Sequence, residues 1–327
     1  MLARLGCRLL AGLAVVLGVV TLTFLLLHLA PGDPIDIMLG PAATAEQRIA
    51  QRTVLGLDRP LPAQFATWLS RFARGDWGNS IAKGQPVRAL LGTAWRETAW
   101  LVALSLLLSY LAGLAIGAVQ AALRGSRLDT FLSVSTITLF AMPGYWLGVM
   151  LVLVFTYWAR LLPAFGTAGL DSDYLHGASW LIDRLRHLAL PLATLTLIGI
   201  GSAARFVRGA MLDTLSQPFI VTARAKGLRP RRVAGHHALR NALGPVVTLL
   251  GLSLPVLFSG AVFVEAVFAW PGVGRVLVEA VRARDYPVVM AATAISAVLV
   301  VAGNLIADVL AAWVDPRVRE GGRTATP

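Results

Sequence analysis

Charged residues are scarce in this chain. Only 14% of its 327 residues are Asp, Glu, Lys or Arg, 57% are apolar, and the mean hydropathy is +0.71, whereas soluble domains contain about 25% charged residues. This composition excludes a soluble globular protein and indicates a membrane-embedded one. The net charge of +12 does not indicate nucleic-acid binding, because the basic residues are scattered among the loops and the aromatic residues lie mostly in or beside apolar runs.

Cysteine is almost absent as well. The single Cys7 excludes an internal disulfide bond, and the sequence has neither a Cys-x-x-Cys pair nor a Cys and His cluster with the spacing of metal ligands. The adjacent His236 and His237 point in different directions on a helix, so we do not expect them to share a metal. The chain is predicted to hold no metal and no other cofactor of its own.

Catalytic motifs are also missing. The sequence contains no Gly-x-Ser-x-Gly and no His-Glu-x-x-His motif, and no paired carboxylates or Ser/His/Asp arrangement stands out. The dipeptide Gly-Lys occurs nowhere, which excludes the phosphate-binding loop G-x-x-x-x-G-K-[ST]. We therefore predict that the chain is not an enzyme and that any ATP driving it is hydrolysed by another subunit.

Six apolar segments predict an all-α integral membrane protein with six transmembrane helices. The first segment, residues 9–30, follows Arg4 and Arg8 as in a signal peptide. Its length exceeds the usual apolar core of about 7–15 residues, so we expect an uncleaved span. The third segment contains Pro143 and Gly144, which predict a kink or break. The remaining spans are expected at residues 98–120, 130–158, 188–206, 244–264 and 288–312.

The connections between the spans differ in charge. One alternate set has 15 basic and 4 acidic residues, and the other has 14 basic and 12 acidic residues. The first set comprises residues 1–8, 121–129, 205–243 and 313–327, and the second comprises residues 31–97, 159–187 and 265–287. Because cytoplasmic loops carry the excess of positive charge, both termini are predicted to be cytoplasmic.

The basic connection around residues 215–245 contains residues that typically start and end helices, and it predicts two short helices. Pro218 suits the first helical position, Gly227 suits the left-handed position after a helix, and Pro230 can start a second helix. Ala223 and Gly227 together form a small-residue face suited to close docking. On composition alone, the alternative is that this connection is merely the positive topological signal.

At this point the sequence resembles a known family. Residues 222–248, TARAKGLRPRRVAGHHALRNALGPVVT, resemble the coupling region of inner-membrane permease subunits of ATP-binding-cassette importers, in the dipeptide, oligopeptide and nickel branch. Further matching segments are LLLHLAPGDP at 25–34, LGLDRPLPAQF at 55–65, RGDWGNSIAKGQPV at 74–87, VEAVFAWPGVGRVLVEAVRARDYPVV at 264–289 and DPRVR at 315–319. The broader EAA pattern is only partly kept, with Val221-Thr222-Ala223 at EAA, Gly227 at the glycine and residues 237–240 in place of I-x-L-P.

The resemblance implies a type I importer permease in a bacterial inner membrane. Its expected partners are a sister permease, two ATP-binding-cassette ATPase domains that bind the Mg-ATP, an extracytoplasmic solute-binding protein and the lipid bilayer. The coupling element would act as a rigid lever in a cleft of the ATPase. The residues implied for coupling are Thr222, Ala223, Arg224, Ala225, Lys226, Gly227, Arg231, Arg232, His237 and Arg240.

A second group of residues is predicted to line or gate the pathway. In spans three to five these are Pro143, Gly144, Pro191, Pro255 and Gly260, and in the turn after span five they are Glu265, Trp270, Pro271 and Gly272. The alternative for the turn is a structural re-entrant segment in which Trp270 anchors the interface. Proline and glycine are also generally frequent in membrane helices.

The predicted domain organisation has four parts. Residues 1–30 form the N-terminus and first span, residues 31–97 an extracytoplasmic helical cap, residues 98–312 a five-span core with the coupling region at 205–243, and residues 313–327 a cytoplasmic tail. A secondary carrier would need intramembrane acidic or histidine relays, and only Asp308 and His28 are available. The substrate stays open between dipeptides, longer peptides, glutathione, nickel chelates and opines, as does pairing with a sister permease or with itself.

Overall fold

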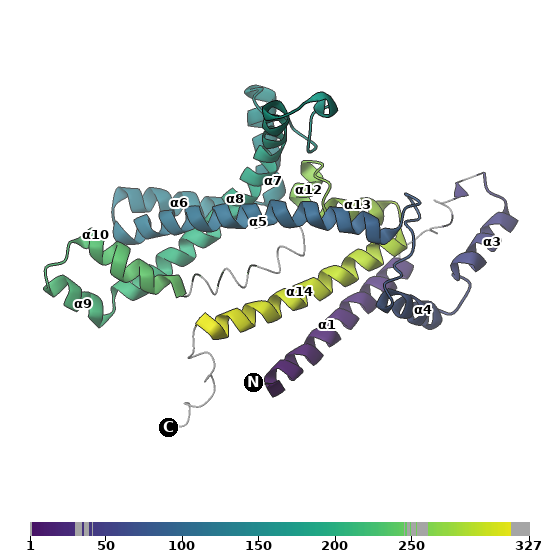
Figure 1. Cartoon of the computed structure of the whole chain (residues 1–327), viewed down its shortest axis with the longest axis horizontal. Coiled ribbons are helices and arrows are strands. Elements are labelled where there is room, and N and C mark those ends of the chain that lie inside the picture. The colour runs from purple at the N-terminus through teal and green to yellow at the C-terminus, as the bar shows by residue number, and fades with distance from the viewer. Residues whose placement is uncertain are drawn as a thin grey trace. The chain divides into compact units, whose positions relative to one another are not determined.

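The computed structural model describes residues 2–29, 35, 39–40, 42–244, 246, 249, 253 and 261–314. Over these residues the ordered elements are helices, with one isolated antiparallel bridge between Asn79 and Pro86 (Figure 1). The all-α prediction is therefore confirmed for the part of the chain that the structure describes. The helices group into two compact units, and each unit is described by itself below.

Among the described residues, four helices are long and apolar enough to cross a membrane. They are α1 (Leu2–Leu29), α5 (Val87–Ala122), α8 (Ala178–Leu215) and α14 (Tyr286–Val314). They contain the predicted first, second, fourth and sixth spans, but α5 and α8 begin about ten residues before the predicted bounds. A helical hydrogen-bond ladder continues wherever the backbone allows it, so it does not stop where hydropathy falls.

The predicted third span is broken where the sequence indicated. Helix α6 (Arg127–Ala141) and helix α7 (Gly144–Val152) are bent by 103° relative to each other. Met142 is extended before Pro143, as expected for a residue that precedes proline. Helix α7 continues into the π-helix η1 (Leu153–Trp158). If this bent pair counts as one crossing, the described residues contain five candidate spans.

The predicted fifth span lies mostly outside the described residues, and so do Pro255, Gly260 and the terminal segment 315–319. The fifth span, and with it the total of six crossings, therefore stays a prediction, and so do the roles of these residues.

In its described residues, the connection 31–97 includes helix α3 (Ala45–Leu55), helix α4 (Leu61–Ala73) and the first turns of α5. Helix α3 begins with a capping box, in which the Thr44 side chain accepts a hydrogen bond from the backbone N–H of Gln47 and the Gln47 side chain accepts one from Thr44. It ends at Gly56, whose φ of 67° is left-handed. The segment is helical, as predicted, and its location outside the membrane stays a prediction.

The first unit is built on the start of α5, the helix α13 (Val273–Arg282) and α14. Its core is formed by Val87, Leu91, Ala94, Val273, Val276, Ala280, Val288, Val289, Ala291 and Ala292. Asp285 is buried just before α14, accepts hydrogen bonds from the backbone N–H groups of Ile81 and Ala82, and also bonds to the Ser80 hydroxyl. These bonds fix the loop between α4 and α5 to the α13–α14 junction.

The second unit depends on close helix packing at glycines. A Cβ added to Gly113 would lie 2.5 Å from the Cβ of Ala203, and one added to Gly117 would lie 2.5 Å from the carbonyl oxygen of Ala204. Helices α5 and α8 therefore meet with their backbones nearly in contact, as small residues allow in membranes. Gly201 makes a similar contact, because its added Cβ would lie 2.7 Å from the Phe140 nitrogen of α6.

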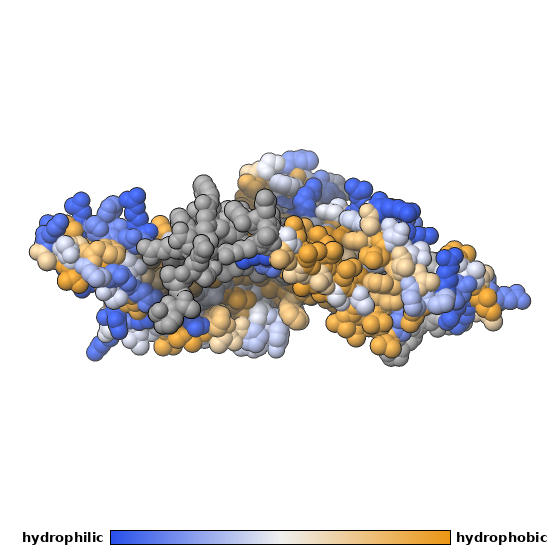
Figure 2. All heavy atoms as spheres, turned by 90° about the horizontal axis from the view of Figure 1, so that it is seen from below, coloured by the Kyte–Doolittle hydropathy of each residue, from blue (hydrophilic) through white to orange (hydrophobic). Residues whose placement is uncertain are grey.

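The surface of the chain is apolar over wide areas, as Figure 2 shows for one face. On α1, Leu10 is 69% exposed and Leu26 is 58% exposed, and on α5 Leu111 is 58% exposed. Exposed apolar side chains that gather along a helix mark a surface that contacts lipid or another protein. They agree with the membrane location that the composition predicts.

Candidate functional site

The basic connection forms the two short helices that its proline and glycine residues predicted. Helix α9 (Pro218–Ala225) has proline at its first position, and Gly227 follows it with φ of 75°. The Gly227 N–H donates to the Arg224 carbonyl at 2.9 Å, and the Leu228 N–H donates to the Ala223 carbonyl at 3.4 Å. These two bonds define a Schellman motif, whose left-handed backbone conformation at residue 227 favours glycine.

The second helix begins at Pro230, also as predicted. The short helix α10 (Pro230–Arg232) passes into the π-helix η3 (Val233–Ala238), and helical conformation then continues to Gly244. The π turn was not predicted from the sequence, because nothing in the residue types of this stretch marks an i→i+5 bond. The rings of His236 and His237 lie edge to face with centroids 5.2 Å apart. Among the described residues, no group of three or more His, Cys, Asp or Glu could hold a metal ion.

One side of this connection packs against its own unit. Ile220 and Ala223 of α9 are buried, and they pack with Val207 and Met211 of α8. We call this whole cluster the coupling core. Its other members are Ala121, Val233, Ala238, Ala242 and Val246. Ala223 is only 7% exposed, so its side chain does not share an exposed docking face with Gly227.

The other side is exposed and combines apolar with basic side chains. Phe219 is 44% exposed and Val221 is 62% exposed, and several cations surround them. We define the coupling surface as the exposed residues Phe219, Val221, Thr222, Arg224, Ala225, Lys226, Gly227, Arg232 and Arg240. Of the other residues implied for coupling, His237 is half-buried and Arg231 lies in α10. Apolar anchors within a basic rim suit an acidic protein partner.

A groove of about 730 Å³ lies beside this surface. Its wall on α8 includes Arg205, Gly209 and Asp213, and its other side includes Phe219 and Asn241. The Phe219 side chain therefore belongs to both the groove and the coupling surface, which makes this end of α8 part of the same exposed site.

The predicted gate residues of the outer turn are largely buried. Glu265 of α12 (Val262–Val267) is fully buried, and Trp270 is 2% exposed and packs against Leu101 and Leu188. Pro271 is exposed, whereas Gly272, which caps α13, is buried. The Glu265 carboxylate is thus not presented at a surface where it could attract a cationic solute.

The predicted pathway residues occupy different settings. Pro143 and Gly144 form the bend between α6 and α7, and a Cβ added to Gly144 would lie 3.1 Å from the Ile198 Cδ1 of α8. Pro191 is buried inside α8, which continues through it without a break. The chain therefore changes direction at Pro143 and Gly144, but not at Pro191.

Two ionic clusters were missed by the sequence analysis. In the first unit, Glu279 of α13 pairs with Lys83 at 3.0 Å and with Arg275 at 2.7 Å. Burial raises the pKa of the Glu279 carboxyl, but the hydrogen bonds from Lys83 and Arg275 outweigh it, so the pKa lies below its ordinary value. In the second unit, Asp129 of α6 pairs with Arg208 of α8. Arg275 and Glu279 are four residues apart on one helix, a spacing that the sequence could have indicated. The Lys83–Glu279 and Asp129–Arg208 pairs join residues that are distant in sequence and have no local sequence signature.

The chain matches a known family over nearly its whole length. Residues 93–320 match the family described as the binding-protein-dependent transport system inner membrane component, and residues 1–106 match the N-terminal part of such membrane components. The chain belongs to this family.

Relatives of known name align with the chain over almost its whole length. The chain is 38% identical over 312 residues to the oligopeptide transport system permease protein AppB of Bacillus subtilis, covering 95% of this chain and 97% of the relative. It is 38% identical over 322 residues to the probable D,D-dipeptide transport system permease protein DdpB of Escherichia coli, with 94% and 95% covered. It is 37% identical over 312 residues to the glutathione transport system permease protein GsiC of Salmonella typhimurium, with 95% and 97% covered.

These matches confirm the family resemblance noted in the sequence. The chain is a multi-pass inner-membrane permease subunit of an ATP-driven, binding-protein-dependent transport system. Such a subunit works with ATPase, solute-binding and further permease components.

Proposed function

We propose that this chain forms half of the translocation pathway of an importer for peptides or a related small solute, and that its coupling surface docks on a separate ATPase subunit. The observation that carries the proposal is the coupling surface itself, in which Phe219 and Val221 are exposed among cations while the opposite side of α9 is buried against α8. A loop that contacts only water would not be expected to expose apolar side chains such as these on one side of a packed helix.

The substrate class is inferred from the relatives. Their names specify oligopeptides, D,D-dipeptides and glutathione, which share peptide or peptide-like amide bonds. A solute of this chemistry is our proposal for the transported molecule, with selectivity residing largely in the separate binding protein. No cofactor is proposed for the chain, and the Mg-ATP would be bound by the ATPase subunits.

The proposed topology has six crossings with both termini in the cytoplasm. The excess of basic residues in alternate connections supports this orientation. It places the coupling surface on the side where ATP is available, and it places the connection 31–97 and helix α13 on the side of the binding protein. The partner permease is proposed to be a sister subunit.

The proposed mechanism transmits movement through packed elements. When two ATPase domains close on ATP, the docked α9 moves with them. Ile220 and Ala223 of α9 are packed with Val207 and Met211 of α8. If α9 moved without α8, these apolar side chains would be exposed to water, at a cost of about 25 cal/mol per Å² of apolar surface. Helix α8 is therefore expected to move with α9. Movement of α8 then changes the pathway between helices.

The first prediction concerns the partners. The tagged chain, co-expressed with its sister permease and ATPase subunits and purified in mild detergent, is expected to retain both and to hydrolyse ATP. In energised vesicles supplied with the solute-binding protein, uptake of a radiolabelled tripeptide is expected to stop when ATP is depleted and to persist when the proton gradient is dissipated. Isolation of the chain alone, with solute transport after reconstitution without ATP, would instead establish a secondary carrier.

The second prediction concerns the charge of the coupling surface. Arg224→Glu is expected to weaken ATPase retention about tenfold, which corresponds to about 1.4 kcal/mol, because it places a carboxylate against an acidic partner. The affinity of the unchanged protein is expected to fall as salt rises, since exposed charges are screened. The matched control is Arg124→Glu, an exposed arginine in the α5–α6 turn. Equal loss in both variants would contradict a specific surface.

A further inference from the structure

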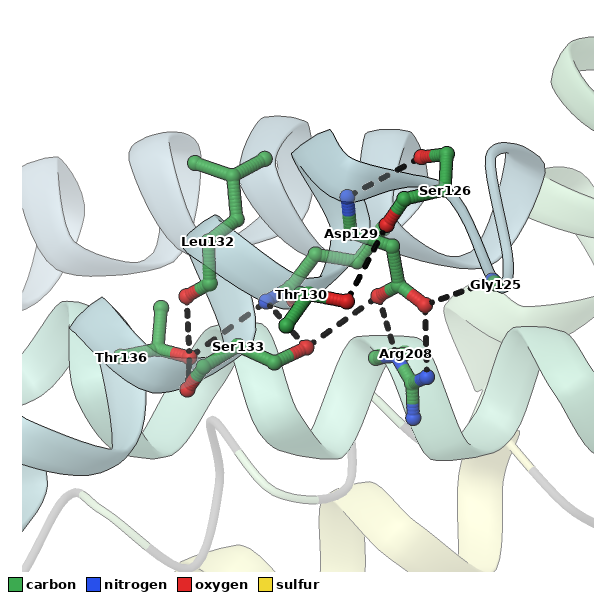
Figure 3. A network of polar contacts seen from close by, with 9 residues as sticks. Gly125, Ser126, Asp129, Thr130, Leu132, Ser133, Thr136 and Arg208 are labelled. Atoms are coloured by element: carbon green, nitrogen blue, oxygen red, sulfur yellow. Dashed lines mark hydrogen bonds and ion pairs between the residues drawn. The ribbon is translucent and has the colours of Figure 1, made fainter.

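The Asp129 carboxylate of α6 is held by Arg208 of α8 in a bidentate ion pair. Arg208 donates from Nε to Oδ1 at 3.1 Å and from Nη2 to Oδ2 at 3.0 Å. Figure 3 shows the carboxylate pointing from α6 toward this guanidinium, with the Gly125 N–H donating to Oδ2 on one flank and the Ser133 hydroxyl donating to Oδ1 on the other. All four hydrogen bonds to this carboxylate therefore come from within one unit of the chain.

The Asp129 carboxylate is buried, the Arg208 side chain is half-buried, and a third helix is linked to the pair. Asp129 is 5% exposed, and the Arg208 side chain is 32% exposed. From α5, Gln120 is fully buried and its Nε2 lies 3.3 Å from the Ser133 hydroxyl, which itself bonds Asp129. Separating the pair would leave the buried Asp129 carboxylate without its counter-ion, so the bidentate contact resists separation.

The position of the pair relates it to the coupling core. Arg208 lies between Val207 and Met211, which both pack in the coupling core with α9. On α6, Asp129 is in the first turn, and the helix runs without interruption from there to the bend at Pro143, over roughly 18 Å at 1.5 Å per residue. The pair thus joins the end of α8 that carries the coupling core to the helix that ends at the bend.

We propose that the Asp129–Arg208 pair fastens α6 to α8, so that movement of the coupling surface reaches the bend and α7. The pair adds a directional, bidentate contact to the apolar and backbone contacts between α6 and α8, such as the close approach at Gly201. Asp129 and Arg208 act here as positioning residues. The inference rests on the proposed docking of the coupling surface on an ATPase.

The test compares α6–α8 distances in two states of the assembled transporter. In a Cys7→Ala background with cysteine-free partners, spin labels at Phe131→Cys of α6 and Ser202→Cys of α8, both exposed, report the distance without nucleotide and after trapping with ATP and vanadate. With the pair intact, the two distributions are expected to coincide. In Asp129→Asn they are expected to separate or broaden by about 1–2 Å or more.

The accompanying assays separate this role from a merely structural one. Asp129→Asn is expected to keep the ATPase subunits and their ATP hydrolysis while tripeptide uptake falls about tenfold, equivalent to about 1.4 kcal/mol of coupling. Arg208→Lys, which keeps the charge but loses the bidentate geometry, is expected to be intermediate. Asp173→Asn, at an exposed residue, is the matched control and should behave as wild type.

Two results would overturn the inference. One is an α6–α8 distance that already changes between the two states in the wild-type protein, and the other is an Asp129→Asn distance that stays the same in both. Failure of the proposed function has a different signature, because the ATPase subunits would then be missing from the purified wild-type complex before any variant is compared.

Discussion

Gly227→Asp is expected to lower ATP-driven uptake by about tenfold or more while the chain still inserts and assembles with its sister permease. Gly227 has φ of 75°, and a Cβ added there would meet nothing within 4 Å. Within this chain the substitution therefore costs only the left-handed strain, roughly 1–2 kcal/mol. The larger effect falls on docking, because the substitution adds bulk and negative charge to a basic surface proposed to meet an acidic partner.

The measurement is uptake of a radiolabelled tripeptide in vesicles, with membrane insertion followed by immunoblot and ATPase retention by pull-down. Gly75→Asp is the matched control, because Gly75 also has a left-handed φ, of 83°, and open space around its added Cβ. It lies outside the coupling surface and should keep uptake near wild type. Gly227→Ala should lose less than Gly227→Asp. Uptake by Gly227→Asp equal to wild type would refute the proposed lever.

Local chemistry explains why the helices of the coupling region could be predicted from the sequence. Pro218 starts α9, Gly227 ends it, and Pro230 starts the next helix. Each of these is a property of one residue's backbone, so it needs no knowledge of the rest of the fold. The break at Pro143 is of the same kind, and the structure confirms it.

Contacts between distant residues were not predictable in this way. The Asp129–Arg208 pair joins positions 79 apart in sequence, and the bond between Ser80 and Asp285 joins positions 205 apart. Their residue types are common, and only the packing of the helices brings them together. The inward direction of Ala223 has the same origin, since a small residue suits both an exposed docking face and a close intrachain contact.

The burial of Glu265 and Trp270 shows a further limit of sequence patterns. A glutamate and a tryptophan after an apolar run suit a mouth that faces water, and the sequence alone does not distinguish that setting from a packed turn. In the structure Trp270 fills the space between Leu101 and Leu188. The chain thus gives these residues a packing role, and their effect on a pathway stays a prediction.

Gly117→Leu is expected to destabilise the second unit more than any substitution on the coupling surface. Its added Cβ would lie 2.5 Å from the Ala204 carbonyl oxygen and 2.8 Å from the Val207 Cβ. The carbonyl belongs to the α8 backbone and cannot rotate away, so α5 and α8 must separate. Overpacking of this kind costs about 1–3 kcal/mol or more, and here it also displaces Val207 from the coupling core.

The thermal unfolding midpoint of the purified complex should therefore fall, and ATPase retention should fall with it. Gly92→Leu provides a control on the same helix, because its added Cβ meets nothing within 4 Å. Both variants replace glycine by the same residue, leucine, and so gain the same intrinsic helix propensity. A difference between their midpoints therefore isolates the contact with α8. If the two midpoints were equal, α5 and α8 would not be in backbone contact in the assembled transporter. Movement of α9 and α8 would then have to reach the rest of the unit through other contacts.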